Sequence, residues 1–200
     1  MPFSRDHEPI TDFLTAVLSL QPTAIIGVSG QPRAFTRQVL EAMASFNERP
    51  IIFPMSNPTS KSECNAEEAY KWTKGRAIFA SGSPFAPVRL KGNTYIPSQA
   101  NNIYIFPGVG LGATTFNTRL VTDEMFFVAA RMLSQKVSAT DLKQGLVYPP
   151  LTKIREISVS IAAAVAEIAF DRGFTNEKRP SDISSFIKSH MYEPKYDSYI

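Results

Sequence analysis

The sequence has few of the residues that build disulfides, metal centres or hydrolytic sites. Its 200 residues include one cysteine, Cys64, and two histidines, His7 and His190, near opposite ends. A single cysteine forms no internal disulfide, which fits a reducing compartment, and Cys64 has no neighbouring histidine or second cysteine to activate it. We interpret it as a packed or half-exposed thiol. Without a carboxylate cluster or a GxSxG elbow, the pattern argues against a metal site and a Ser-His-Asp hydrolase.

Runs of like charge and long apolar runs are also missing. Lys and Arg number 21 against 18 Asp and Glu, a net charge of +3, with no block of five or six like charges. No basic stripe or stacking motif indicates nucleic-acid binding. No apolar run reaches the roughly 20 residues of a membrane span, and residues 1–9 are too polar for a signal peptide. We expect a cytoplasmic protein that binds neither nucleic acid nor membrane, although organellar targeting upstream is compatible with this sequence.

Short apolar runs alternate with amphipathic segments in the first half of the chain. The runs 23–28 (TAIIGV), 50–55 (PIIFPM) and 76–80 (RAIFA) each end in small polar residues, as buried parallel strands do. Apolar residues recur at helical spacing over about 33–46 and 66–74. The order strand, helix, strand, helix, strand predicts right-handed β-α-β units and a parallel α/β sheet.

The second half of the chain has mainly helical patterns. The apolar stretch 103–106 follows two asparagines and is interpreted as a further strand. Beyond Gly112 the spacing becomes helical, with Asp123 as the expected cap of one helix and a long helix expected to end before Gly173. Within one partial domain of residues 1–200, we therefore predict a sheet portion over about 22–112 and a helical portion over about 113–200.

The predicted strand ends carry small and neutral polar residues, and ligands of open α/β sheets bind at the carboxyl ends of strands. The segments concerned are Gly27-Val28-Ser29-Gly30, Ser56-Asn57-Pro58, Ser81-Gly82-Ser83 and, nearby, Asn101-Asn102. An asparagine amide both donates and accepts, so it can hold a carboxylate or a ribose hydroxyl without bringing charge into the site. The pattern predicts a polar cleft.

Each of these features also has a purely structural interpretation. Asn-Pro, as at Asn57, commonly begins a turn, and Asn101-Asn102 can be an ordinary loop. The glycines of 108–112 (GVGLG) have the wrong spacing for a dinucleotide fingerprint and favour close helix packing. The pattern alone does not distinguish an oxidoreductase from a binding module.

Six segments extend this pattern into long motifs that follow one another along the chain. They are PTAIIGVSGQPRAFT (22–36), ERPIIFPMSNPTSKSECNAEEAY (48–70), KGRAIFASGSPFAPV (74–88), QANNIYIFPGVGLG (99–112), YPPLTKIREISVSIA (148–162) and MYEPKYDSYI (191–200). In this order they resemble the C-terminal part of the cofactor domain of the malic enzymes, and the resemblance covers nearly the whole chain.

The resemblance implies a function and site residues. Malic enzymes decarboxylate (S)-malate oxidatively to pyruvate and CO2, reducing NAD or NADP in the presence of Mg or Mn. By resemblance, Asn57 contacts the substrate and the nicotinamide ribose, and Asn101 and Asn102 hold the malate carboxylate. The turn that passes under the dinucleotide corresponds to Gly27, Val28, Ser29 and Gly30.

Other parts of the family pattern have no match in this sequence. The catalytic tyrosine and lysine, the acidic metal ligands and the dinucleotide fingerprint lie upstream in the family. We therefore expect a Rossmann-like sheet that lacks its first β-α-β unit, in a chain that is inactive alone and holds no metal ligand. In the family a small residue often follows the glycine turn, and this sequence has Arg33 at that position. The full-length protein is expected to be a homo-oligomer, either a dimer or a tetramer.

Two alternatives are of a different class. A non-catalytic module that binds a dinucleotide, or that assembles through an exposed sheet edge, would show the same pattern. A phosphate acetyltransferase-like or other α/β ligand domain is disfavoured because none of its motifs is found. The choice between NAD and NADP is not determined by these residues.

Overall fold

The chain divides into two compact units. The computed structural model describes residues 7–194, so residues 195–200 of the last resembling segment lie outside the described residues. One unit contains the residues up to Ala100 together with 139–147, and the other contains 101–138 and the residues from Tyr148 onward. The expected change to helical structure at Gly112 thus falls inside the second unit, which begins earlier, at Asn101.

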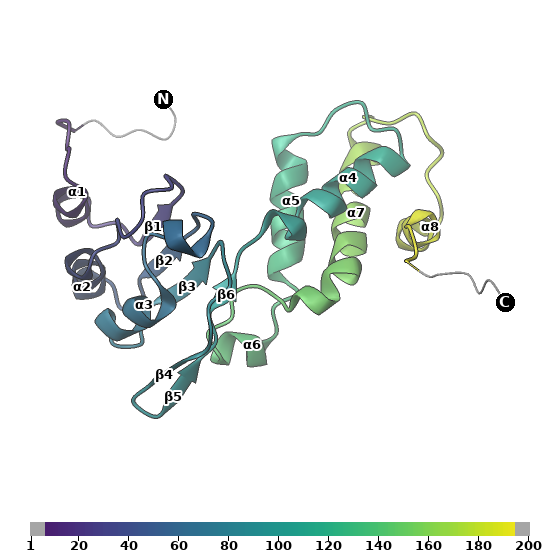
Figure 1. The fold of residues 1–200 in the computed structure, drawn as a ribbon. Helices are drawn as coiled ribbons and strands as arrows, with labels where there is room; N and C mark the ends of the chain where they lie inside the picture. Colours follow the sequence, from purple (N-terminus) through teal and green to yellow (C-terminus); the bar gives the residue numbers. More distant parts are fainter. Residues whose placement is uncertain (1–6, 195–200) are drawn as a thin grey trace. The chain divides into compact units, whose positions relative to one another are not determined.

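The first unit contains a four-stranded parallel sheet, which confirms the predicted α/β class. Its strands follow one another across the sheet in chain order (Figure 1): β1 (Ala24–Gly27), β2 (Ile51–Pro54), β3 (Ile78–Ser81) and β6 (Ser98–Gln99). Because all four strands run the same way, the ends of β1, β2 and β3 meet at one edge of the sheet.

A row of apolar side chains across the sheet forms the core of this unit. Ile25, Ile52 and Phe79 are register partners on neighbouring strands, and each is at most 5% exposed. Three helices pack on this row and lie on one side of the strands (Figure 1): α1 (Phe13–Leu20), α2 (Arg37–Phe46) and α3 (Ala66–Trp72). β1 was expected to be buried, but Ile26 on its other face is 62% exposed, because α1, α2 and α3 pack on the opposite face, which carries Ile25 (Figure 1). β1 pairs only with β2 and is an edge strand of the described sheet.

Side-chain caps determine where the helices begin. α2 starts after Thr36, whose hydroxyl accepts from the Val39 N–H at 3.3 Å, and not at Arg33, whose φ of 60° is left-handed. Asn65 and Glu68 form a reciprocal capping box at the start of α3. Thr122, and not the expected Asp123, caps α5 (Asp123–Ser134). The Asp123 carboxylate lies in the first turn of the helix, where its negative charge interacts favourably with the helix dipole.

Besides β6, a hairpin, a 3-10 turn and a short helix of the first unit were not predicted from the sequence. β4 (Val88–Leu90) and β5 (Asn93–Tyr95) form a hairpin whose two turn residues, Lys91 and Gly92, both have positive φ. A 3-10 turn, η1 (Thr59–Lys61), follows the β2 loop. α6 (Ala139–Lys143) belongs to the segment that returns to this unit, where the Val147 N–H donates to the Ser98 hydroxyl at 2.7 Å.

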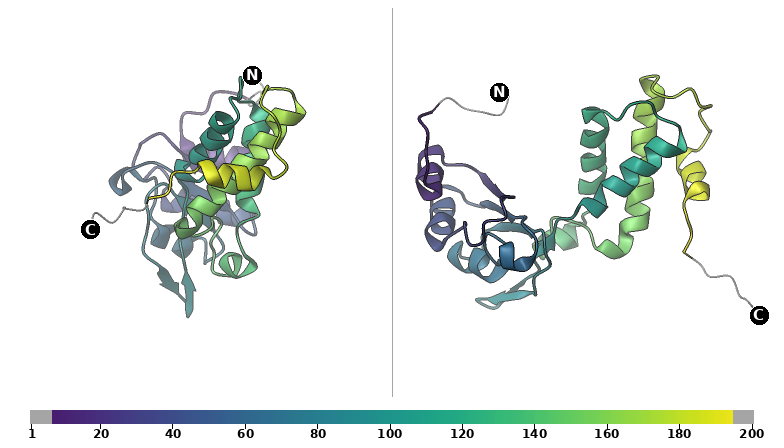
Figure 2. Two further views of the ribbon diagram at one scale, coloured as in Figure 1. Left: turned by 90° about the vertical axis from the view of Figure 1, so that its right-hand side faces the viewer. Right: turned by 45° about the horizontal axis from the view of Figure 1, so that its top comes forward.

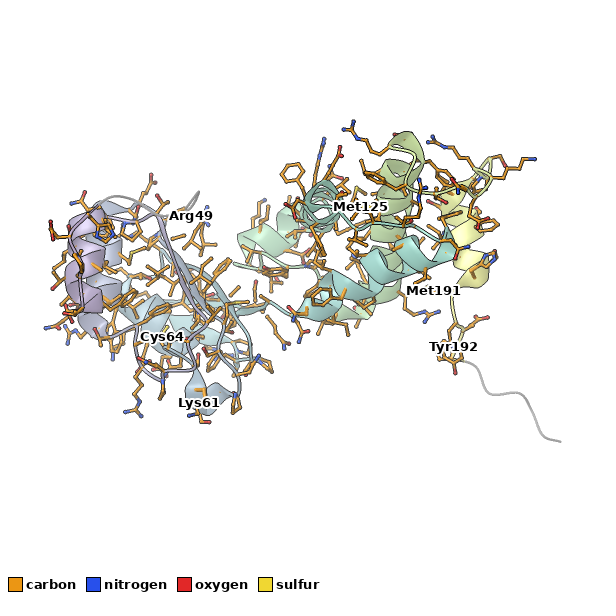
Figure 3. The ribbon with its side chains drawn as sticks, turned by 90° about the horizontal axis from the view of Figure 1, so that it is seen from above. Arg49, Lys61, Cys64, Met125, Met191 and Tyr192 are labelled. Atoms are coloured by element: carbon orange, nitrogen blue, oxygen red, sulfur yellow. The ribbon has the colours of Figure 1, made fainter. Side chains whose placement is uncertain are left out.

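The second unit is helical, with α7 (Ile154–Asp171) packed against three other helices. These are α4 (Phe106–Thr115), α5 and α8 (Ile183–His190), arranged around α7 in Figure 2, and the short turn η3 (Leu151–Lys153) precedes α7. Met125 of α5 is fully buried in this packing (Figure 3). Nowhere in the described part of the chain does a helix have the length and hydropathy needed to cross a bilayer.

The prediction of a strand over 103–106 is wrong. The chain forms a 3-10 turn, η2 (Asn102–Tyr104), and then enters α4. The Asn101 side chain accepts from the Ile103 N–H at 3.0 Å and so turns the backbone, and Pro107 suits the first turn of a helix. The real fourth strand, β6, is only two residues long and precedes this stretch.

Two of the three glycines of α4, Gly108 and Gly112, allow close helix packing, the interpretation that the sequence favoured. A Cβ on Gly108 would lie 2.7 Å from the Cβ of Ile161, and one on Gly112 would lie 2.6 Å from the backbone oxygen of Ala162. These two glycines are one helical turn apart and face α7, whereas Gly110 has no atom within 4 Å of its would-be Cβ. The two helices approach this closely because both positions lack a side chain.

Candidate functional site

Hydrogen bonds connect the loops that follow the three strands. The Gly30 N–H donates to the Ser56 hydroxyl at 2.9 Å, which joins the loop after β1 to the loop after β2. The Ser83 hydroxyl donates to the Asn57 Oδ1 at 2.5 Å, which joins the loop after β2 to that after β3. In the first unit the sheet thus brings together the residues that the sequence placed at its polar edge.

Asn57 is exposed, and its amide is held in one orientation. Because Oδ1 accepts from Ser83, the Nδ2 group remains available, and no other described side chain or backbone group uses it. Gly82 permits this approach, since a Cβ there would lie 2.2 Å from the Met55 oxygen and 2.9 Å from Asn57 Nδ2. The Asn57-Pro58 peptide is cis. Asn57 therefore combines a structural bond with a free pair of donors.

The turn from Gly27 to Gly30 presents backbone and small polar groups at the surface. Val28 is 76% exposed, Ser29 is exposed, and Gly30 has a φ of 69° that favours glycine. A Cβ on Gly30 would meet no atom within 4 Å, so the space beside it is open. The groups on offer are neutral peptide groups and one hydroxyl, a donor set that fits the ribose and amide groups of a dinucleotide.

Glu63 is a buried acidic residue beneath this turn that the sequence analysis did not single out. Glu63 is only 1% exposed, and its Oε1 accepts a hydrogen bond from the Ser56 hydroxyl at 2.5 Å. The polar run around it, SKSEC, gives the pattern of a solvated loop, so no local signal marks it as buried. Its position depends on the packing of the segment between β2 and α3.

The paired asparagines of the sequence analysis belong to the second unit. Asn101 is the cap of η2, with its side-chain oxygen bound to the Ile103 N–H, and this is a structural role. Asn102 is the first residue of η2 and is exposed. Their expected contact with a malate carboxylate stays a prediction.

A surface hollow of about 670 Å³ lies elsewhere in the first unit, on the helices. Half of its lining residues are basic, and the full lining is Arg37, Glu41, Ala44, Ser45, Lys71, Trp72, Lys74 and Arg76. The Arg76 guanidinium donates to the carbonyls of Ala44, Asn47 and Glu48, and so ends α2, while Arg37 pairs with Glu41. We do not regard this hollow as the site, because it is lined by α2, α3 and the segment between α3 and β3, and not by the carboxyl ends of the strands.

Residues 1–170 match the family model described as "Malic enzyme, NAD binding domain". This chain belongs to the malic enzyme family. It is 52% identical over 199 residues to an NADP-dependent malic enzyme of Phaseolus vulgaris and 51% identical to one of Vitis vinifera. A chloroplastic NADP-dependent malic enzyme of Oryza sativa is 49% identical. The matches cover 99% of this chain but only 34%, 34% and 31% of those relatives.

Solved malic enzyme structures have the same fold. The Pyrococcus horikoshii enzyme matches with a TM-score of 0.61 and 26% identity, and covers 84% of this chain and 34% of its own. The Entamoeba histolytica enzyme matches with a TM-score of 0.66 at 23% identity, over 84% of this chain and 31% of its own. The Rossmann-like fold expected from the sequence is confirmed.

The metal expected of a malic enzyme finds no fitting ligand set in the part of the chain that the structure describes. Among residues 7–194 there is no group of three or more His, Cys, Asp or Glu side chains able to hold an ion. Glu63, whose carboxyl group lies against Gly27 of the turn after β1, is buried and bound to Ser56. We therefore assign no metal ligand to these residues and no reaction step through a metal.

Cys64 is expected to resist thiol reagents while the chain is folded. It is 3% exposed and lies among packed side chains (Figure 3), and burial, with smaller effects of Glu68 and Glu63, raises the pKa of its thiol. Because the thiolate is the reactive form, labelling should be far slower than for the denatured chain. With a single cysteine present, mass spectrometry after timed alkylation measures this directly. Equal rates in the native and denatured states would contradict the packed-thiol interpretation.

Proposed function

We propose that this chain supplies dinucleotide and substrate contacts to a full-length enzyme that converts (S)-malate to pyruvate and CO2 while reducing NAD or NADP. The observation that carries the proposal is the neutral cluster at the edge of the sheet. There Asn57, oriented by Ser83, belongs to the same hydrogen-bonded loops as the turn that ends in Gly30. The chain spans about a third of its curated relatives, 34% of two of them, so the complete activity requires residues beyond these.

The chemistry of the cluster suits an anionic substrate. The Nδ2 hydrogens of Asn57 are proposed to donate to a malate carboxylate or a ribose hydroxyl, and Asn101 and Asn102 to hold the substrate carboxylate. A neutral amide can orient malate by hydrogen bonding without bringing a net charge into the site. When bound, NAD or NADP would supply the acceptor for the hydride from C2 of malate, while the C2 hydroxyl proton would pass to a base outside this chain. The resulting ketone loses CO2, and the enolate that remains is protonated to pyruvate.

The turn from Gly27 to Gly30 is proposed to lie under the dinucleotide. Gly30, which has open space beside it, allows the backbone to approach the cofactor closely, and the exposed peptide groups and the Ser29 hydroxyl replace water around the ribose. The proton-transfer groups of the reaction, and the Mg or Mn site, are proposed to lie outside this chain.

The activity is tested by comparing the full-length protein with the 200-residue chain. With malate, Mg or Mn, and either dinucleotide, we expect the full-length protein to form reduced nicotinamide and pyruvate and the isolated chain to form neither. Both products are measured, because pyruvate distinguishes decarboxylation from simple dehydrogenation. Turnover by the isolated chain would overturn the division of labour, and an inactive full-length protein would overturn the function.

The exposed edge of the sheet favours a second candidate, an assembly module. β1 pairs only with β2 among the described strands, and Ile26 and Val28 are 62% and 76% exposed. Titration calorimetry of the chain with NAD and NADP separates the candidates: heat with either favours cofactor binding, whereas no heat and a stable oligomer by light scattering favour assembly.

For the full-length protein we propose a homo-oligomer, a dimer or tetramer, in the cytoplasm.

A further inference from the structure

Glu63 occupies a position that is unusual for a carboxylate. Glutamate is rarely buried without partners, yet this residue is 1% exposed, between the loop after β2 and α3. Among residues 7–194, the donors to its side chain come from one residue: the Ser56 hydroxyl donates to Oε1 at 2.5 Å and the Ser56 N–H donates to Oε2 at 3.4 Å. Glu63 therefore fixes both the backbone and the side chain of the residue that precedes Asn57.

The same carboxyl group lies directly against the dinucleotide turn. A Cβ on Gly27 would be 2.4 Å from Cδ, 2.5 Å from Cγ and 2.7 Å from Oε1 of Glu63. Gly27 does not have the left-handed φ that requires glycine at Gly30, so space alone explains this glycine. The end of β1 is thus seated on the side chain of Glu63.

A relay of hydrogen bonds continues from Glu63 through Ser56 to the far end of the turn. The Gly30 N–H donates to the Ser56 oxygen, and the Ser56 hydroxyl donates to Glu63. The main chain of the same segment holds the residues that follow, because the Phe35 N–H donates to the Glu63 carbonyl at 3.0 Å and the Arg33 N–H to the Ser62 carbonyl at 3.1 Å. Both ends of the cofactor turn are therefore connected to one short segment.

We propose that Glu63 is a positioning residue that holds the dinucleotide turn and the Asn57 loop in one mutual geometry. This inference rests on the proposed function of that turn and loop. Burial and the bonds with Ser56 leave Glu63 no access to substrate, so it acts through Ser56, Gly27 and Gly30. The role requires two acceptor oxygens that face Ser56, and it does not require the negative charge itself. Glu63→Gln keeps the volume but replaces one acceptor with a donor that faces the Ser56 N–H.

The test compares E63Q with E67Q in the full-length enzyme. Glu67 is the same residue type four positions further along, on α3, and is exposed. For E63Q we expect a weaker dinucleotide Kd, a higher KM for malate and a kcat/KM about 10-fold lower, since small displacements of bound reactants slow the reaction. E67Q should match the wild type. A purely structural role would lower the Tm of E63Q and leave Kd and KM unchanged, and that result overturns the proposal.

Hydrogen exchange supplies a readout that does not depend on turnover. Peptides spanning residues 27–31 of the full-length protein, followed by mass spectrometry, should exchange faster in E63Q than in the wild type or E67Q, because the Gly30 N–H loses a fixed acceptor. If E63Q does not fold, Ser56→Ala removes the same relay, keeps Glu63, and should give the same change. Unaltered exchange and unaltered dinucleotide Kd in the folded variant overturn the proposal.

The proposed function and the role of Glu63 can be overturned separately. A wild-type enzyme that does not oxidise malate overturns the proposed function, and the exchange and dinucleotide-binding measurements then still decide the role of Glu63. An active wild type with an E63Q variant equal to E67Q in Kd, KM and exchange overturns only the role of Glu63.

Discussion

Replacing Asn57 with aspartate in the full-length enzyme is expected to lower kcat/KM for malate by about 100-fold, the effect of losing one well-placed donor in a site. The substitution keeps the shape of the side chain, and the Ser83 hydroxyl, 2.5 Å from Oδ1, still has an oxygen to donate to. What changes is the group that carried the free donors. An oxygen replaces Nδ2, so two donors are lost and a negative charge faces an anionic substrate.

A matched control separates this effect from a general effect of charge. Asn93→Asp makes the same substitution at an exposed residue in β5, on the hairpin and away from the strand ends. We expect N93D to retain the wild-type kcat and KM. Steady-state kinetics with malate varied at saturating dinucleotide, and circular dichroism to confirm folding, measure both variants. An N57D enzyme with the kinetics of N93D would show that Asn57 serves only the bond to Ser83.

Replacing Gly112 with alanine is expected to destabilise the helical unit by about 2 kcal/mol, the usual cost of overpacking a tight contact. A Cβ at this position would lie 2.6 Å from the oxygen and 3.0 Å from the Cα of Ala162, both backbone atoms of α7. Backbone atoms cannot rotate away as the end of a side chain can. α4 and α7 must therefore move apart, and the apolar contacts along them are weakened.

Gly110 provides the control within the same helix. A Cβ there meets nothing within 4 Å, and alanine is the better helix former, so G110A should stabilise the unit by up to about 1 kcal/mol. Urea unfolding followed by far-UV circular dichroism reports mainly on the helices. The single tryptophan, Trp72, is in the first unit, so its fluorescence should show an unchanged midpoint if the units unfold independently. Shifts of the same sign for G112A and G110A would refute the packing role.

Much of the fold is predictable because its signals are local. Strands over 23–28, 50–55 and 76–80 follow from short apolar runs closed by turn residues, and they form β1, β2 and β3 within one or two residues. The helices between them follow from apolar spacing. The stretch 103–106 was misassigned because four apolar residues have no period that separates a strand from a buried helical turn.

The candidate site divides in the same way. Its exposed members, the turn ending in Gly30 and the loop at Asn57, are visible in sequence because strand ends and small polar residues mark them. Ser83 is not visible as a partner, since it bonds to a residue from another loop. Glu63 is not visible either, since its position against Gly27 depends on packing against the end of another strand. Ser83 is 26 residues from Asn57 along the chain, and only the pairing of β2 with β3 brings the two loops together.

The parallel α/β class, the strand ends that carry neutral polar groups and the resemblance to malic enzymes can all be recognised in the order of the residues, because each depends on local patterns along the chain. Tertiary structure alone decided that Glu63 lies under Gly27, that Ser83 orients Asn57, and that Gly112 must lack a side chain while Gly110 need not. Those facts depend on distances between segments remote in the chain, and such distances follow from packing and not from the residues of any one segment.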